Sequence, residues 1–187
     1  MQHKSPLLVL ALAFGAYFGA AGVHWFEFNR DALNDFQLWR LLTSHFYHTN
    51  LTHLLLNCFA VILLWTMHGH FYRAKTFILL FLTCALCTGV GLLLFSSLNY
   101  YVGLSGVLHG IFLWGTLKDI YAHEKTGYLL LIGVVIKLIH EQVYGASESI
   151  AQMIEANVAV DAHLYGAIGG LSFFIIQKFY NTVQTEN

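Results

Sequence analysis

Charged residues are scarce in this sequence, and so is proline. Only 10% of the 187 residues are Asp, Glu, Lys or Arg, one residue is proline, and 57% are hydrophobic. A soluble domain of this length normally has a larger fraction of charged residues, whereas a chain that crosses a bilayer several times is made largely of apolar segments. The composition therefore predicts a polytopic membrane protein. The formal net charge of −1 gives no indication of nucleic-acid binding, so no nucleic-acid partner is expected.

Cysteine is also rare and carries no metal or redox signature. Cys58, Cys84 and Cys87 all fall within apolar segments. The Cys84-x-x-Cys87 pair lacks the second ligand pair that a zinc site requires, so these side chains are interpreted as small apolar groups. Neither a metal ion nor an organic cofactor is predicted.

Long apolar segments are abundant, and they divide the chain into six predicted spans. The spans lie at approximately 6–26, 52–69, 76–97, 104–121, 127–142 and 160–179. Lipid offers the backbone no hydrogen-bonding partner, so each span must be helical. The sequence predicts an all-α integral membrane protein in which residues 1–187 form a single six-helix domain within the lipid bilayer.

Basic residues are distributed unevenly between the two sides of this predicted bundle. Because cytoplasmic connections are enriched in Lys and Arg, the side with more of them is predicted to be cytoplasmic. Only Arg30 and Arg40 clearly lie on the opposite side, so both termini are predicted to be cytoplasmic. The basic residues assigned to the cytoplasmic side are Lys4, Arg73, Lys75, Lys118, Lys125 and Lys178.

The first 26 residues have an alternative interpretation as a secretory signal peptide. Lys4 precedes an apolar run that ends in small residues at 19–22, as in a signal sequence. We favour a retained span, because the apolar run is long for a signal peptide and its removal would leave five spans and upset the charge pattern.

A serine flanked by glycines lies at the start of the fourth predicted span, in the sequence Gly103-Leu104-Ser105-Gly106. Gly106 and Gly110 form a small-xxx-small pair, which favours close helix packing. The same serine is a candidate nucleophile. The chain also contains 11 histidines, several of them at membrane depth, where ionisable groups are costly and usually functional.

Two further spans place polar side chains on one helical face. His53 and Asn57 are four residues apart on the second span, where they could form part of a polar site or simply a hydrogen-bonded contact between helices. On the sixth span, His163 is followed on the same face by Gly166, Ala167 and Gly170.

The glycine face of the sixth span predicts which helix His163 meets. A face without side chains lets a neighbouring helix approach closely, and the obvious neighbour carries Gly106 and Gly110. This packing would bring Ser105 and His163 together as a nucleophile and its base. Lys137 and Glu141, four residues apart in the fifth span, are interpreted as a structural ion pair.

These motifs together resemble the rhomboid intramembrane serine proteases. The matching residues, in order along the six-helix core, are Trp39-Arg40, His48-x-Asn50-x-x-His53-x-x-x-Asn57, Gly103-x-Ser105-Gly106 and Ala162-His163-x-x-Gly166-x-x-x-Gly170. The compact chain and the sequence Gly-Leu-Ser-Gly-Val-Leu-His-Gly at 103–110 look most like the rhombosortase branch.

The resemblance implies a role for each of these residues. Ser105 would be the nucleophile and His163 the general base, with His53, Asn57 and the backbone N–H of Ser105 as oxyanion donors. His48 corresponds to a structural histidine, Asn50 stands where many relatives have Ser, and the glycines at 103, 106, 166 and 170 would support the site. The family uses a Ser-His dyad. Asp161 is no obvious third member, because two residues along a helix it points about 200° away from His163.

The resemblance also implies substrates, a location and a gate. Rhombosortases are inferred to cleave membrane proteins that carry a Gly-Gly motif before a C-terminal apolar anchor and a basic tail. We therefore expect a bacterial inner-membrane enzyme whose site opens to the periplasmic side. Water and substrate need an entry, and the polar stretch 143–159 is the candidate gate.

His109 departs from the broad rhomboid pattern, which usually has Tyr at this position. It lies four residues after Ser105 on the same helical face. Three roles stay open: the base in place of His163, a ring that stacks on and orients His163, or a core histidine. We favour the orienting role, because a residue one full turn deeper need not reach the serine hydroxyl.

Two other classes of function are compatible with parts of the sequence. A small transporter with a histidine proton relay would favour acidic partners within the spans and inverted repeats, and neither is convincing here. A catalytically inactive relative that binds membrane proteins would have lost the serine or the histidine, and this chain retains both.

Overall fold

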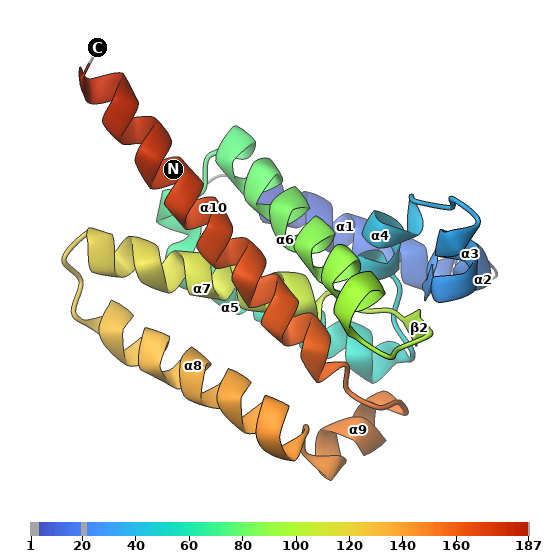
Figure 1. Cartoon of the computed structure of the whole chain (residues 1–187). Helices are drawn as coiled ribbons and strands as arrows, with labels where there is room; N and C mark the ends of the chain where they lie inside the picture. The colour runs from blue at the N-terminus through green and yellow to red at the C-terminus, as the bar shows by residue number, and fades with distance from the viewer. Residues whose placement is uncertain (1–3, 20–21, 187) are drawn as a thin grey trace.

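The computed structural model describes residues 4–19 and 22–186, and these are mainly helical (Figure 1). The elements are α1 (Ser5–Phe18), α2 (Val23–Phe26), β1 (Phe28–Asn29), α3 (Arg30–Asn34), α4 (Arg40–Thr43), the 3₁₀ turn η2 (Ser44–Phe46), α5 (Leu51–His68), the 3₁₀ turn η3 (Gly69–Phe71), α6 (Ala74–Phe95), β2 (Tyr100–Tyr101), α7 (Ser105–Tyr121), α8 (Thr126–Tyr144), α9 (Glu148–Ile154) and α10 (Val160–Glu186). The prediction of an all-α chain omitted β1 and β2, which form a short antiparallel pair in which Phe28 is opposite Tyr101.

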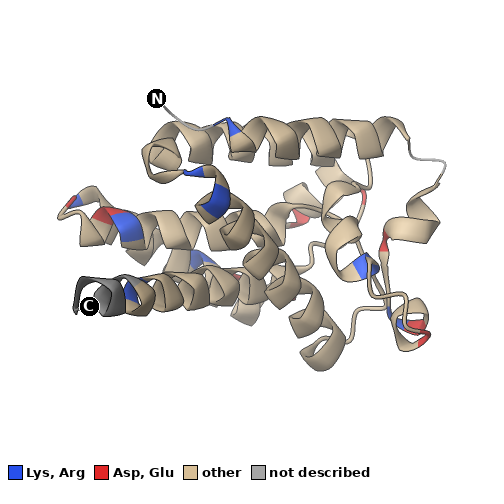
Figure 2. Ribbon diagram, turned by 90° about the horizontal axis from the view of Figure 1, so that it is seen from above, with Lys and Arg blue, Asp and Glu red and all other residues tan. Residues whose placement is uncertain are grey.

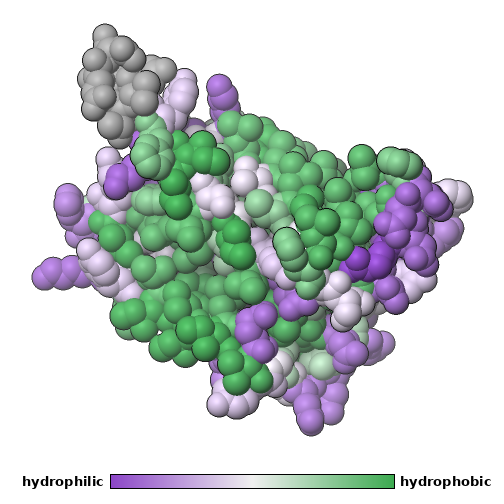
Figure 3. Space-filling view, in the orientation of Figure 1, coloured by the Kyte–Doolittle hydropathy of each residue, from purple (hydrophilic) through white to green (hydrophobic). Residues whose placement is uncertain are grey.

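Five of the six predicted spans coincide with helices: α5, α6, α7, α8 and α10. Among the described residues, three helical segments are long and apolar enough to cross a membrane, namely Leu51–Phe71, Ala74–Phe95 and Thr126–Tyr144. Large apolar side chains such as Phe59 on α5 and Leu129 on α8 are exposed on the outside of the bundle. Apolar residues cover a broad part of the face seen in Figure 3. Such extensive apolar exposure suits contact with lipid rather than water.

The helix that corresponds to the first predicted span, 6–26, is shorter than that span. Helix α1 has 14 residues and ends at Phe18, where the N–H of Gly19 bonds to the carbonyl of Gly15. Glycine has a low helix propensity and commonly ends helices. Residues 20 and 21, which the predicted span included, lie outside the described residues, and a separate short helix, α2, begins at Val23.

Helix α1 begins, and α10 ends, at the same end of the bundle (Figure 1). Most Lys and Arg positions lie toward this end in Figure 2. Helices α5, α7 and α10 begin at the opposite end, so the first turns of all three are close to the outer connection formed by residues 22–50.

Two arginines hold this connection against the bundle. Arg30 donates hydrogen bonds to four backbone carbonyls at the carboxyl end of α6 and just beyond it, at distances between 2.6 and 3.2 Å. Arg40 donates to the carbonyls of His24 and Glu27, each at 2.9 Å. Positive charge is favourable at a helix carboxyl end. The arginines therefore fix the segment that pairs with β2, and β2 leads directly into α7.

Helices α7 and α10 pack backbone against backbone at the centre of the bundle. A Cβ atom added at Gly166 would overlap the carbonyl group of Gly106, and one added at Gly170 would overlap that of Gly110. In the same way, a Cβ at Gly106 would meet the carbonyl oxygen of Ala162 at 2.8 Å. This is the close packing that the glycine spacing predicts.

Enlarging a glycine in this contact is expected to separate α7 from α10. Gly166→Leu and Gly170→Leu should each lower thermal stability, because overpacking a tight contact typically costs about 1–3 kcal/mol or more. The thermal midpoint of the purified protein in detergent measures this.

Gly133→Leu on α8 is the matched control. Beyond the adjoining residues and backbone of its own helix, no described atom lies within 4 Å of a Cβ added there, so the thermal midpoint should stay close to that of the unsubstituted protein. An unchanged midpoint for Gly166→Leu would contradict the close packing.

Candidate active site

Ser105 is the first residue of α7, and the backbone that leads to it is tightly held. Gly103 has φ +128°, a conformation that L side chains rarely adopt, and a Cβ there would meet the ring of His53 at 2.8 Å. The N–H of Gly103 bonds to the carbonyl of Ser44 at 3.1 Å, and the Tyr101 hydroxyl donates to the Gly103 carbonyl at 2.6 Å. Glycine is therefore required at 103 both by its backbone conformation and by the ring beside it.

His163 lies in the first turn of α10, directly beside the serine. Its Nε2 atom is 3.0 Å from Ser105 Oγ, although the two residues are 58 positions apart in the chain. The histidine is buried, whereas Ser105 is partly exposed. The glycine contact between α7 and α10 makes this approach possible, because no side chain separates the two helices immediately below it.

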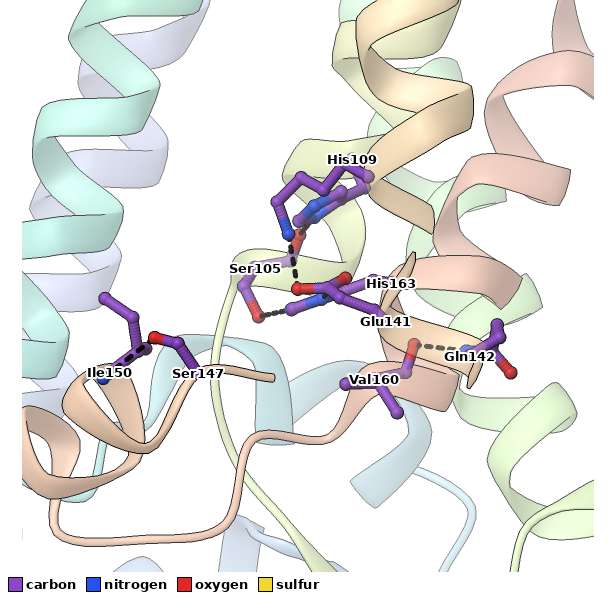
Figure 4. A network of polar contacts seen from close by, with 9 residues as sticks. Ser105, His109, Glu141, Gln142, Ser147, Ile150, Val160 and His163 are labelled. Carbon is purple, nitrogen blue, oxygen red and sulfur yellow. Dashed lines mark hydrogen bonds and ion pairs between the residues drawn. The ribbon is translucent and has the colours of Figure 1, made fainter. Parts of the chain in front are cut away.

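Glu141, near the end of α8, contacts the other ring nitrogen of this histidine (Figure 4). Glu141 Oε2 is 2.8 Å from His163 Nδ1, and Oε1 forms the predicted ion pair with Lys137. The spacing in the sequence indicated the pair with lysine but gave no sign of the contact with histidine, because that contact depends on how α8 lies against α10. Asp161 instead accepts a hydrogen bond of 2.6 Å from the Ser96 hydroxyl.

His109 stacks on the imidazole ring of His163. The two ring centroids are 4.0 Å apart and the planes differ by 17°. His109 Nδ1 is 2.8 Å from the backbone carbonyl of Ser105, so this nitrogen carries the proton and donates it. Of the three arrangements considered for His109, the geometry is that of a ring stacked on His163.

His53 lies in the first turn of α5, close to the backbone that precedes Ser105. Asn50 caps this helix, because its side chain accepts a hydrogen bond of 2.8 Å from the N–H of His53. Asn and Ser are both favoured at this capping position, which gives a physical reason why Asn can stand where relatives have Ser. His53 Nδ1 is 3.1 Å from the Thr49 hydroxyl and 3.5 Å from the Thr49 N–H.

Asn57 and His48 are both buried and lie on either side of His53 along the chain. Asn57 is one turn further into α5, and its Nδ2 atom has no hydrogen-bond partner among the described residues. The His48 ring packs edge-to-face on His53, with centroids 4.9 Å apart. Burial lowers the pKa of His48 to about 3, so this ring is neutral at physiological pH.

A cavity of about 250 Å³ opens beside the serine. Its lining includes Ser105, His53, Thr49 and Tyr101, together with residues of the segment between α9 and α10. Glu27 from the outer connection also lines it, and partial burial raises the pKa of that carboxyl group. Asn57 does not belong to this lining.

Helix α9 lies over one side of this cavity and is bonded to the start of α5. The Thr49 hydroxyl donates to the carbonyl of Ile154 at 2.5 Å, and the Asn50 side chain donates to that of Met153 at 3.0 Å. These two bonds join the end of α9 to the residues that precede His53. The predicted gate at 143–159 is therefore in contact with the site.

Three of these residues have a donor set that suits a metal ion. His109, Glu141 and His163 each offer one ligand atom, and these atoms lie within 4.8 Å of one another. In the observed arrangement, however, His163 Nδ1 is hydrogen-bonded to Glu141, and His109 Nδ1 to the Ser105 carbonyl. A metal ion bound through His163 Nδ1 would have to displace the bond to Glu141, and in the observed arrangement the cluster is a hydrogen-bonded network.

The comparison with known proteins agrees with this arrangement. The sequence profile of the Rhomboid domain matches residues 35–178, which include every polar residue described at the site except Glu27. The chain belongs to the rhomboid family. It is also similar to the Bacillus subtilis (strain 168) protein named "Putative rhomboid protease YdcA", with 27% identity over 186 residues that cover 92% of this chain and 90% of the relative.

Membership of the rhomboid family has two general consequences. It implies an integral membrane protein, in agreement with the apolar helices, and an intramembrane serine protease in general. The glycine spacing in the sequence predicted that Ser105 and His163 are neighbours, and the family resemblance implied that His53 lies beside them. Sequence reasoning missed Glu141 and also Tyr101, whose hydroxyl bond to Gly103 is not apparent from any motif.

The stacked ring of His109 gives a prediction about substitutions. His109→Tyr retains an aromatic ring against His163 and should retain much of the activity. His109→Ala removes that ring and should lower activity by about 10–10²-fold. Turnover of a transmembrane substrate in detergent micelles measures both variants.

The control for this prediction is the pair Ser105→Ala and His163→Ala. If His109→Tyr were as inactive as Ser105→Ala while His163→Ala kept turning over, the general base would be His109.

Proposed function

We propose that this protein is an intramembrane serine endopeptidase that uses Ser105 as nucleophile and His163 as general base. The observation that carries the proposal is the 3.0 Å contact between Ser105 Oγ and His163 Nε2 at the edge of the cavity. A hydroxyl beside an imidazole is the arrangement that activates serine for attack on a carbonyl group.

The proposed reaction begins when Ser105 Oγ attacks the scissile carbonyl carbon. The serine proton passes to His163 Nε2, and the histidine then donates it to the leaving amine as the C–N bond breaks. Water entering from the cavity hydrolyses the acyl-enzyme by the same route in reverse. The negative charge that develops on the carbonyl oxygen requires donors positioned beside Ser105.

Three donors are proposed to stabilise this oxyanion. The N–H of Ser105 is in the first turn of α7, where N–H groups have no partner within the helix and the helix dipole favours negative charge. His53 would donate from Nε2, provided that its Nδ1 accepts the Thr49 N–H. The unpartnered Asn57 Nδ2 is the third candidate. One such donor typically contributes about 10²–10³ in rate.

The orientation proposed for the enzyme places six spans in a bacterial inner membrane with both termini in the cytoplasm. Two observations support this orientation. Helix α1 begins and α10 ends at the same end of the bundle, and most basic residues lie toward that end. Ser105, His53 and His163 all lie in first turns at the opposite end. On this proposal the cavity opens toward the periplasm.

The proposed substrate is a transmembrane segment with helix-breaking residues at the cleaved position, such as Gly-Gly before a C-terminal anchor. A peptide bond inside a helix has its carbonyl engaged in hydrogen bonds, so the segment must unwind before Ser105 can reach it. This substrate class is the one associated with rhombosortases, which the sequence at 103–110 resembles.

The segment 143–159 is proposed as the gate through which the substrate enters. Its support is that, among the described residues, two hydrogen bonds from Thr49 and Asn50 to backbone carbonyls join the end of α9 to the residues before α5. In the proposal α9 moves by breaking these bonds and exposing the buried Ile154, while the glycine contact between α7 and α10, to which α9 does not contribute, is kept. Loops and short helices that cover a site commonly control access in this way.

The dyad is tested with a serine-directed fluorophosphonate in detergent. Wild-type protein should be labelled at Ser105 and should cleave a transmembrane substrate, whereas Ser105→Ala and His163→Ala should abolish cleavage with nearly unchanged thermal stability. Because members of a catalytic unit act together, the double variant should be little worse than either single one.

Two outcomes of this experiment would contradict the proposal. Substantial turnover by Ser105→Ala would exclude Ser105 as the nucleophile. A folded wild-type protein that binds transmembrane segments but neither reacts with the fluorophosphonate nor cleaves would instead be an inactive binder.

The substrate proposal makes a separate prediction about the cleaved segment. Replacing the glycines next to the scissile bond with Leu should stop cleavage, because Leu stabilises the helix by about 1 kcal/mol per residue relative to Gly. Cleavage of matched Gly-Gly and Leu-Leu substrates in proteoliposomes measures this. Equal cleavage of the two would mean that local unwinding does not select the site.

A further inference from the structure

Glu141 is a buried acidic residue that the reaction described above does not use. It lies one turn from the end of α8 and is 8% exposed. Its two carboxylate oxygens have different partners: Oε1 is paired with Lys137, and Oε2 is 2.8 Å from His163 Nδ1 (Figure 4). A carboxylate within a membrane helix is costly unless it is paired, and residues of this kind usually have a function.

The charges around Glu141 balance in the resting state. The Lys137 side chain is 49% exposed, so its ammonium group can remain partly hydrated while it pairs with the buried carboxylate. The opposite charges of Lys137 and Glu141 offset each other in this pair. A purely structural ion pair needs only Lys137 and Glu141, so it does not explain the contact between Glu141 and His163.

This contact determines which nitrogen of His163 carries the proton. An ionised carboxylate can only accept hydrogen bonds, so Nδ1 must be the protonated nitrogen. Nε2 is then left with its lone pair, and it lies 3.0 Å from Ser105 Oγ. That tautomer is the one that can take the serine proton.

Three neighbours from two other helices restrain the same imidazole ring. Ser105 contacts Nε2 and His109 stacks on the ring face, both from α7, while Glu141 from α8 contacts Nδ1. Each acts in a different direction, so the ring can neither flip nor tilt without losing a contact. Preorganisation of this kind reduces the cost of reaching the reactive geometry.

We propose that Glu141 is a positioning residue that completes a Ser105–His163–Glu141 triad, in place of the two-residue dyad that the family resemblance implies. When Ser105 attacks, its proton moves from Oγ to His163 Nε2 and the ring becomes a cation. Glu141 keeps its negative charge, holds the Nδ1 proton by a hydrogen bond and stabilises that cation. When the leaving amine takes the proton from Nε2, the ring is neutral again and Glu141 is unchanged. The inference rests on the proposed function.

The structure provides a control for the simpler possibility that Glu141 only ties α8 to α10. Gln142, the next residue, also connects these helices, because its side chain donates a hydrogen bond of 3.2 Å to the carbonyl of Val160. Gln142 is exposed, and in the described part of the chain it forms no hydrogen bond with Ser105, His109 or His163. Substitution of Gln142 therefore removes a hydrogen bond between α8 and α10 without removing the contact between Glu141 and His163.

The test compares one variant that keeps the shape of Glu141 with one that keeps its charge. Glu141→Gln has nearly the same volume but no charge, and Glu141→Asp keeps the charge on a side chain one methylene shorter. In detergent micelles with a transmembrane substrate, Glu141→Gln should lower kcat by about 10²–10⁴-fold with KM nearly unchanged. Glu141→Asp should retain more kcat than Glu141→Gln, and Gln142→Ala should stay near the wild-type kcat.

Thermal stability and fluorophosphonate labelling complete the experiment. The triad predicts slow labelling of Ser105 in Glu141→Gln at an unchanged thermal midpoint. A wild-type kcat in Glu141→Gln would overturn the role of Glu141. The role would also be overturned if Glu141→Gln were more active than Glu141→Asp and the activity of the variants followed their thermal midpoints. That result is expected of a residue with a purely structural role.

Failure of this inference is distinguishable from failure of the proposed function. If wild type cleaves, Ser105→Ala is inactive and Glu141→Gln behaves as wild type, the protease stands and only the triad is wrong. If wild type neither cleaves nor reacts with the fluorophosphonate, the proposed function itself is wrong, and the triad with it.

Discussion

The contact between α7 and α10 is the constraint on which the rest of the site depends. Gly106, Gly110, Gly166 and Gly170 remove the side chains that would otherwise separate these helices, so the backbones touch. Because the helices are this close, a histidine in the first turn of one reaches the serine at the start of the other. A single added methyl group in this contact would overlap backbone carbonyl atoms, which cannot move without shifting a whole helix.

The polar groups of the site are accommodated in an apolar bundle because nearly all of them bond to one another. His163 uses both ring nitrogens, His109 bonds to the Ser105 carbonyl, and Glu141 divides its oxygens between Lys137 and His163. Burying a polar group without a partner is costly, so a satisfied network of this kind is also a rigid one. Among the described site residues, Asn57 Nδ2 and both ring nitrogens of His48 are exceptions, and the proposed partner of Asn57 Nδ2 is the oxyanion, which exists only during the reaction.

A second structural requirement is that the outer connection be fixed in place. Arg30 holds this connection to the carboxyl end of α6, β1 pairs with β2, and Tyr101 in β2 bonds to the Gly103 carbonyl two residues before the serine. Through these contacts the connection is tied to the backbone that immediately precedes Ser105. In contrast, two hydrogen bonds and the buried side chain of Ile154 attach the end of α9, which is the proposed gate, to its surroundings.

The amino-acid sequence was sufficient to predict the membrane class and the positions of five helices, and it led to the hypothesis that Ser105 and His163 meet. These follow from local regularities: apolar length, helical periodicity and glycine spacing are properties of one segment or of two matching faces. The early end of the first helix and the β1–β2 pair were not predicted, because short elements depend on the groups packed around them. The contact between Glu141 and His163 was decided only by the tertiary structure. The i,i+4 spacing of Lys137 and Glu141 predicts an ion pair within α8 alone. It does not predict which residue of another helix the second carboxylate oxygen contacts.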